Sequence, residues 1–280
     1  EEFQDQQSVA DEIEQSINQL KDKNPDLSNI SSSLTSRASN ITAGSALDEK
    51  LNYALGLLEM QKTLKPIKES LEKATTIQDL FSISAEAIDE CALDPELKEL
   101  FSKNVEDTLK LCIGKTLHSF KKESLALVKE MEKNKETFFE LNNDLNQKFE
   151  KITLPDTLDL PKELAGAKEF YTKTAASTEK VQVAYLGAYK TQLDYEATRF
   201  TKYIEKEPNL ERLALCKKNM DNLKAIVDYC KQATSSKTSP EVVELVDAIR
   251  GQLGKLEHTL YNRIYEQTIQ QQKELLAQLA

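Results

Sequence analysis

Apolar residues recur every three or four positions along residues 97–152, and this stretch contains no proline. Such spacing is the period of an amphipathic α-helix, not the alternation of a β-strand. Asp94-Pro95-Glu96 is a typical helix start, and Pro155 ends the pattern. The pattern predicts one helix over about residues 95–152, about 85 Å long, which must lie against other long helices or a partner. Its apolar positions include Leu97, Phe101, Val105, Leu109, Cys112, Leu117, Phe120, Leu125, Val128, Met131, Phe138, Leu145, Phe149 and Ile152.

Helical periodicity resumes after a loop and predicts further long helices over about residues 162–206, 209–233 and 240–280. Glu207-Pro208-Asn209 separates the first two of these helices, and a proline there is compatible with a kink in one helix or with a hairpin. We favour a kink or a very short break, because heptad spacing continues beyond the proline. The positions that continue the heptad are Leu213, Cys216, Met220, Leu223, Val227 and Cys230.

The first 45 residues predict one short helix followed by a linker. Val9, Ile13, Ile17 and Leu20 have helical spacing. Residues 27–45 are rich in Ser, Thr and Asn and almost uncharged, which is typical of a mobile linker or a loose arm. From Ser45 a second helix is predicted across Pro66, where we expect a kink or a break. A short helix with Ile77, Phe81, Ile88 and Cys91 follows.

These patterns predict an all-α fold. We expect an elongated antiparallel bundle of three long helices with coiled-coil packing, and shorter N-terminal helices along one side. The domain organisation would be a short helix with its linker over residues 1–45, and the helical bundle over residues 46–280. Glycine and proline are few, at seven each, tryptophan is absent and 30% of the residues are charged. This composition favours long helices over sheets.

The formal net charge of −10 argues against binding to nucleic acid or to a membrane through a polybasic surface. No apolar run approaches the ~20 residues that span a bilayer. The four cysteines show no metal-ligand spacing, which favours a reducing, cytoplasmic location. The chain does not begin with Met, so we expect a fragment of a longer protein. Membrane association through segments outside the fragment, and secretion into a host cell, stay open.

The sequence offers little catalytic chemistry. Its two histidines, His118 and His258, belong to no metal-binding pattern such as HExxH. The seven glycines stand apart from one another, so no phosphate-binding loop is formed, and no nucleophile motif is present. We therefore expect no enzymatic activity, no cofactor and no metal site.

Two groups of residues are candidates for an interaction surface. Tyr189 and Tyr195 are candidates for contact with a protein partner, with packing in the core or at its boundary as the alternative. Lys217, Lys218 and Lys224 form a weakly basic stretch that is a candidate for contact with anionic lipid or an acidic partner. The alternative for these lysines is a solvated helix face.

The composition, the many long helices and the absence of catalytic motifs resemble the coiled-coil effectors that intracellular bacterial pathogens send into host cells, some of which act on host SNARE proteins and vesicle fusion. The Gln-bearing segment Phe3–Lys23, with Ile13, Ile17 and Leu20, is SNARE-like but shorter than a SNARE motif. The resemblance implies no functional residues. It implies a non-enzymatic scaffold or tether that binds protein partners through amphipathic helices in vesicle or membrane traffic.

The lengths and order of the helices also resemble BAR domains, which dimerise into curved membrane-binding modules. The three arms would be Leu97–Ile152, Lys162–Lys231 and Glu241–Ala280. This alternative implies a homodimer with peripheral membrane contact, and the acidic net charge departs from it. An α-helical toxin component ranks lower, because the chain has no long apolar segment that would insert into a bilayer.

Overall fold

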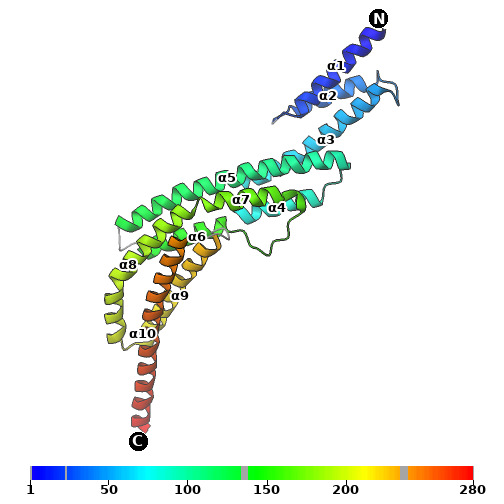
Figure 1. Ribbon diagram of the computed structural model, residues 1–280. Helices are drawn as coiled ribbons and strands as arrows, with labels where there is room; N and C mark the ends of the chain where they lie inside the picture. Colours follow the sequence, from blue (N-terminus) through cyan, green and yellow to red (C-terminus); the bar gives the residue numbers. More distant parts are fainter. Residues whose placement is uncertain (1, 23, 134–137, 234–238, 280) are drawn as a thin grey trace. The chain divides into compact units, whose positions relative to one another are not determined.

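The computed structural model describes residues 2–22, 24–133, 138–233 and 239–279 (Figure 1). Within these ranges every regular element is a helix, which confirms the predicted all-α class. The α-helices are α1 (Glu2–Leu20), α2 (Leu27–Ala38), α3 (Ala46–Lys73), α4 (Ile77–Asp89), α5 (Pro95–Lys133), α6 (Phe138–Ile152), α7 (Ala165–Ala176), α8 (Glu179–Lys206), α9 (Leu210–Ala233) and α10 (Pro240–Leu279), and a 3₁₀ turn, η1, covers Lys162–Leu164.

The chain folds as two compact units. Helix α5 contributes its first half to unit one and its second half to unit two. The domain boundary that the sequence predicts at residue 45 falls inside unit one. Unit one comprises Glu1–Thr75, Asp79–Cys112 and Asp159–Lys168, and unit two comprises Thr76–Gln78, Ile113–Leu158 and Glu169–Ala280.

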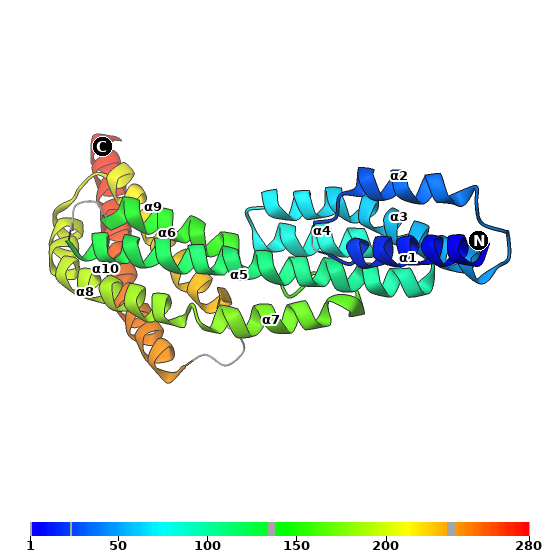
Figure 2. The ribbon, with the colours of Figure 1, turned by 90° about the horizontal axis from the view of Figure 1, so that it is seen from above.

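The first three helices lie side by side in unit one (Figures 1 and 2). The amphipathic pattern of the first residues forms α1, as predicted. Gln61 of α3 donates a hydrogen bond from Nε2 to the carbonyl oxygen of Leu20 over 2.6 Å, which ties the end of α1 to α3. The side chains that α1 buries include the four predicted ones, Val9, Ile13, Ile17 and Leu20.

Helix α2 occupies most of the segment that the sequence predicts as a linker, so that prediction is wrong for Leu27–Ala38. The Asp26 carboxylate accepts a hydrogen bond from the Asn29 amide over 3.2 Å and caps the start of the helix. Ile30 and Leu34, four residues apart, are 3% and 1% exposed. Two apolar side chains at helical spacing, with a capped first turn, thus outweigh a composition that is typical of a linker.

Helix α3 continues through Pro66, where the sequence predicts a kink or a break; the helix is not broken there. Ser45 Oγ accepts a hydrogen bond from the Asp48 amide over 3.2 Å and caps its start, as predicted. Proline removes one backbone donor from the helix. Leu64 and Leu71, on either side of Pro66, are 0% and 1% exposed. Their burial stabilises the helix across the missing hydrogen bond.

The single helix predicted over residues 95–152 is wrong, because this stretch forms two helices that fold back on each other in unit two. The ring centroids of Phe120 in α5 and Phe149 in α6 are 5.0 Å apart. Lys148 donates to Glu123 over 2.6 Å. In one straight helix, Phe120 and Phe149 would be about 43 Å apart. Residues 134–137, between the two helices, lie outside the described residues.

The helix predicted over residues 162–206 is also divided. Helix α7 ends at Ala176, and α8 begins at Glu179 after a turn at Ser177-Thr178. The Ser177 hydroxyl donates to the Thr174 carbonyl oxygen, and the Thr178 hydroxyl donates to the Ala175 carbonyl oxygen, each over 2.6 Å. The backbone amides of Ser177 and Thr178 donate to the same two carbonyl oxygens, so the hydroxyls reinforce the turn that ends α7.

Pro208 lies in a hairpin between α8 and α9, so a kink in one helix is wrong, whereas the very short break that was the other part of the favoured prediction is present at residues 207–209. The backbone of Glu207 is extended, and Asn209 Oδ1 accepts hydrogen bonds from the amides of Glu211 and Arg212 over 2.9 and 3.3 Å. An asparagine that caps the first turn starts a new helix. Arg263 of α10 donates from Nε to the Glu207 carbonyl oxygen over 3.1 Å, which holds the hairpin against α10.

Helices α8 and α10 of unit two run in the same direction, and α9 runs antiparallel to them (Figure 1). Ser239, before α10, donates from its amide to Glu179 at the start of α8 over 2.8 Å, whereas Arg263 reaches the end of α8. The predicted apolar face of α10 is buried at Val242, Val246, Ile249, Leu253, Leu256 and Leu260. Of the predicted heptad in α9, Leu213, Cys216 and Met220 are buried, and the side chains of Leu223, Val227 and Cys230 lie outside the described ones.

Candidate functional site

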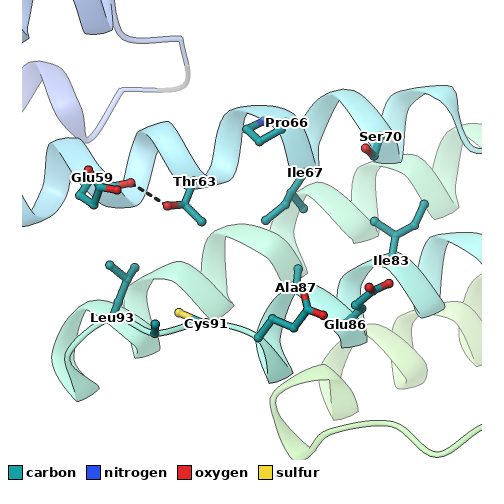
Figure 3. Close-up of a pocket in the computed structure, with 12 residues that line it drawn as sticks. Glu59, Thr63, Pro66, Ile67, Ser70, Ile83, Glu86, Ala87, Cys91 and Leu93 are labelled. Carbon is teal, nitrogen blue, oxygen red and sulfur yellow. Dashed lines mark hydrogen bonds between the residues drawn. The ribbon is translucent and has the colours of Figure 1, made fainter.

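A groove of about 710 Å³ lies in unit one between α3 and the end of α4 (Figure 3). Half-buried aliphatic side chains form much of its lining, and three glutamates stand among them. The lining residues are Glu59, Thr63, Pro66, Ile67, Ser70, Ile83, Glu86, Ala87, Glu90, Cys91, Ala92 and Leu93.

Helical spacing explains why these residues share one groove. Those of α3 recur at steps of three and four from Glu59 to Ser70, with Pro66 and Ile67 adjacent, so they lie on one face of the helix. The α4 residues Ile83, Glu86 and Ala87 follow the same rule. The chain then leaves α4, and Glu90, Cys91, Ala92 and Leu93 after the helix complete the lining.

Helix α4 buries the face that points away from the groove, and this leaves its groove face only partly covered. Ile77, Leu80 and Phe81 are 0% exposed, and Ile88 is 1% exposed. Burial of this stripe fixes the rotation of α4 about its axis. The groove side chains Ile83 and Ala87 are therefore left only partly covered.

The polar groups of α3 in the groove are of two kinds. The Thr63 hydroxyl donates to the Glu59 carbonyl oxygen over 2.9 Å, so its proton is used within the helix. The Glu59 carboxylate is exposed, as are those of Glu86 on α4 and of Glu90 just after it. Among the described residues, none of these three carboxylates forms an ion pair. The groove therefore combines an apolar lining with unneutralised negative charge.

Two of the basic residues of α3, Lys65 and Lys68, lie on another face of this helix, whereas the exposed Lys62 and Lys73 lie at the edge of the groove face. Lys65 and Lys68 line a polar pocket of about 460 Å³ beside the turn between α1 and α2. Glu69 and Glu72 line the same pocket, so the lysine charges are balanced there. Positions 65 and 68 are rotated by more than a quarter turn from Thr63 and Ile67 on an ideal helix. The acidic character of the groove is thus not offset by Lys65 and Lys68.

The two tyrosines that the sequence marks as candidate partner contacts have different surroundings. Tyr189 is 1% exposed, and burial raises its pKa. Its ring centroid is 5.8 Å from that of Tyr185. The prediction of a surface position is therefore wrong for Tyr189, which packs in the core of unit two. Tyr195 is 51% exposed and stays a candidate contact.

The three lysines of the weakly basic stretch are exposed or half-buried on α9, and two of them already have partners. Lys217 Nζ lies 5.8 Å from the centroid of the Tyr261 ring. Lys224 forms an ion pair with Glu257 of α10. The hydrogen bond between them raises the pKa of Lys224 and lowers the pKa of Glu257. Lys218 is exposed. Two of these three charges thus hold α9 against α10.

The described part of the chain contains no group of three His, Cys, Asp or Glu side chains placed to hold a metal ion. His118 and His258 are both exposed, and His258 Nε2 is 3.2 Å from Asn262 Nδ2. Across the described helices, no segment is both long and apolar enough to cross a membrane.

Sequence reasoning missed the groove, although one signal for it is present. Between Lys73 and Lys98 the chain has no lysine or arginine, which marks α4 and the following turn as a strongly acidic segment. The six acidic residues of this segment are Asp79, Glu86, Asp89, Glu90, Asp94 and Glu96.

Comparisons of the chain with protein-family models, curated protein sequences and solved structures gave no match.

Proposed function

We propose that the chain is a non-enzymatic helical scaffold that binds a protein partner in the groove between α3 and α4. The observation that supports this function is the exposed apolar lining of the groove, which includes Pro66, Ile67, Ile83, Ala87 and Leu93. A partner that covers these side chains removes apolar surface from water, and this is the main favourable contribution to most protein association.

A protein segment suits the groove better than a small molecule does. The groove is open along one side. Sites for small molecules bury most of the ligand surface, whereas a trough between two parallel ridges accepts a segment of another chain that lies along it. The two ridges here are the groove face of α3 and, facing it, the end of α4 with the chain segment that follows it (Figure 3).

The setting that we propose is vesicle or membrane traffic, which the resemblance to pathogen effectors supports. Direct lipid binding through Lys217, Lys218 and Lys224 is the alternative, and it has less support because Lys217 and Lys224 already contact Tyr261 and Glu257. Co-sedimentation with anionic vesicles that is lost when the three lysines are replaced by glutamate would favour the lipid alternative.

Selection from a random peptide library tests the docking function, with the full chain as the target. Ala87→Trp fills the groove, and Ala248→Trp places the same ring at an exposed position of α10 as a control. We expect the selected peptides to lose at least tenfold in affinity for Ala87→Trp and to bind Ala248→Trp like the unmodified chain. Equal melting temperatures show that each variant is folded. Peptides that bind Ala87→Trp with unchanged affinity would contradict a docking site in this groove.

A further inference from the structure

We propose that the segment bound in the groove is a basic amphipathic helix, with aliphatic side chains on one face and Lys or Arg beside them. This inference rests on the proposed docking function and specifies the partner of the same site. Two observations carry it: the length of the groove lining along α3, and the sign of the charge around it.

The length of the groove matches a short helix. The lining residues of α3 run from Glu59 to Ser70. Eleven residue steps at ~1.5 Å each give a lining about 16 Å long, which is about three helical turns. A partner helix of this length presents apolar side chains at positions i, i+3 or i+4, and i+7 toward the groove. Two or three aliphatic anchors would therefore contact Ile67, Ile83 and Ala87.

The negative charge around the groove favours a partner segment with positive charge. Glu59 stands on the α3 side and Glu86 on the α4 side (Figure 3). Glu90, directly after α4, also lines the groove. Further carboxylates, Asp89 and Asp94, flank these positions in the sequence, and no basic residue occurs between Lys73 and Lys98. The exposed Lys62, beside Thr63, offsets only part of this negative charge. A segment with Lys or Arg beside its apolar anchors meets opposite charge there, whereas an acidic segment meets like charge.

The chain itself leaves these charges available to a partner. In the described part of the structure the carboxylates of Glu59, Glu86 and Glu90 have no Lys or Arg within ion-pair distance. Lys65 and Lys68 of α3 line the polar pocket by the α1–α2 turn instead. A bound cationic side chain would therefore not need to displace an internal ion pair.

Three synthetic peptides test the inference, each designed as the same leucine-faced helix of about five turns, with lysine, glutamine or glutamate at the flanking positions. Fluorescence anisotropy measures their affinity for the full chain at low salt. We expect the lysine peptide to bind about tenfold more tightly than the glutamine peptide, and the glutamate peptide to bind most weakly, because several exposed charge pairs contribute together. The preference should shrink as salt is added.

Charge removal at the groove provides the decisive variant. Glu59→Gln, Glu86→Gln and Glu90→Gln combined should bring the affinities of the three peptides to within about twofold of one another. The matched control combines Glu69→Gln, Glu72→Gln and Glu99→Gln, three exposed positions outside the groove lining, and should keep the preference for lysine. Circular dichroism and the melting temperature show that both variants fold.

The outcomes separate this inference from the docking function. Equal affinities of the three peptides for the unmodified chain, all lost in Ala87→Trp, would overturn the basic partner and leave the docking groove intact. A lysine preference that survives the Glu59, Glu86 and Glu90 variant would also overturn the inference. Peptide binding that Ala87→Trp does not weaken, or no binding of any of the three peptides, would overturn both proposals.

Discussion

Tyr171 shows how one side chain fixes the joint between two helices of unit two. Its hydroxyl donates to the carbonyl oxygen of Ile152, the last residue of α6, over 2.6 Å. The side chain is 8% exposed, and burial raises the pKa of Tyr171 to about 12. The neutral phenol is therefore the form that the fold stabilises.

The stability of unit two should fall in alkaline solution. The folded-state pKa of Tyr171 lies above the value of about 10 expected for an unfolded chain. Its contribution is therefore fully present below about pH 10 and is lost as the pH rises toward about 12. In Tyr171→Phe we expect the free energy of unfolding to be about 1 kcal/mol lower at pH 8, because the hydrogen bond to Ile152 is missing, and to decline less at higher pH.

Urea unfolding followed by circular dichroism between pH 8 and 11.5 provides this measurement. Tyr265→Phe is the control, because the Tyr265 side chain is 67% exposed. Superimposable pH profiles of Tyr171→Phe and the unmodified chain would show that the Tyr171 phenol does not contribute as described.

At the scale of helices, periodicity predicted which residues face the core better than where each helix ends. The stripe of α10 from Val242 to Leu260 is buried as the sequence predicts. The division of residues 95–152 was missed, although the sequence carries two signals for it. No apolar residue occurs between Met131 and Phe138. Thr137 also precedes Glu140 by three residues, which is a capping-box pattern. A regular spacing on both sides of such a gap does not reveal that the chain reverses, because reversal depends on contacts between distant residues such as Phe120 and Phe149.

Local capping chemistry explains two further predictions that were wrong, the linker over residues 27–45 and the kink at Pro208. Asp26 starts α2 inside a serine-rich segment, and Asn209 starts α9 directly after Pro208. Both are short polar residues before an apolar helix face, which is a helix-start signal. Composition and heptad continuity were given more weight than these caps, and the caps proved to be the better guide.

Replacement of a buried residue in α10 tests the packing of α8, α9 and α10. Leu253 is 1% exposed, and Leu253→Asp places a charge in the apolar interior of unit two. We expect the free energy of unfolding to fall by about 4 kcal/mol, seen as a large decrease in melting temperature. Val243 is 44% exposed on the same helix, so Val243→Asp should change stability by less than about 0.5 kcal/mol. Equal melting temperatures for the two variants would contradict the assigned face of α10.

For the whole molecule, the sequence predicted the fold class but not the site. The groove forms because α3 and α4 bury one face each and leave the faces with Ile67 and Ala87 uncovered. The sequence predicts both helices, yet which of their faces come together is decided by tertiary packing within unit one. The acidic run from Asp79 to Glu96 was visible in the sequence, but its significance depends on the apolar lining beside it.

The most direct test of the docking groove uses Cys91, which lies in its lining and is only partly buried. In a variant with Cys112, Cys216 and Cys230 replaced by alanine, the alkylation rate of Cys91 is measured with and without a saturating amount of the lysine-flanked peptide. A second variant, with Cys91→Ser and Ala248→Cys added, reports on a distant exposed site. We expect the bound peptide to slow alkylation at position 91 at least tenfold and to leave position 248 unchanged. Equal rates at position 91 with and without bound peptide would contradict the groove as the docking site.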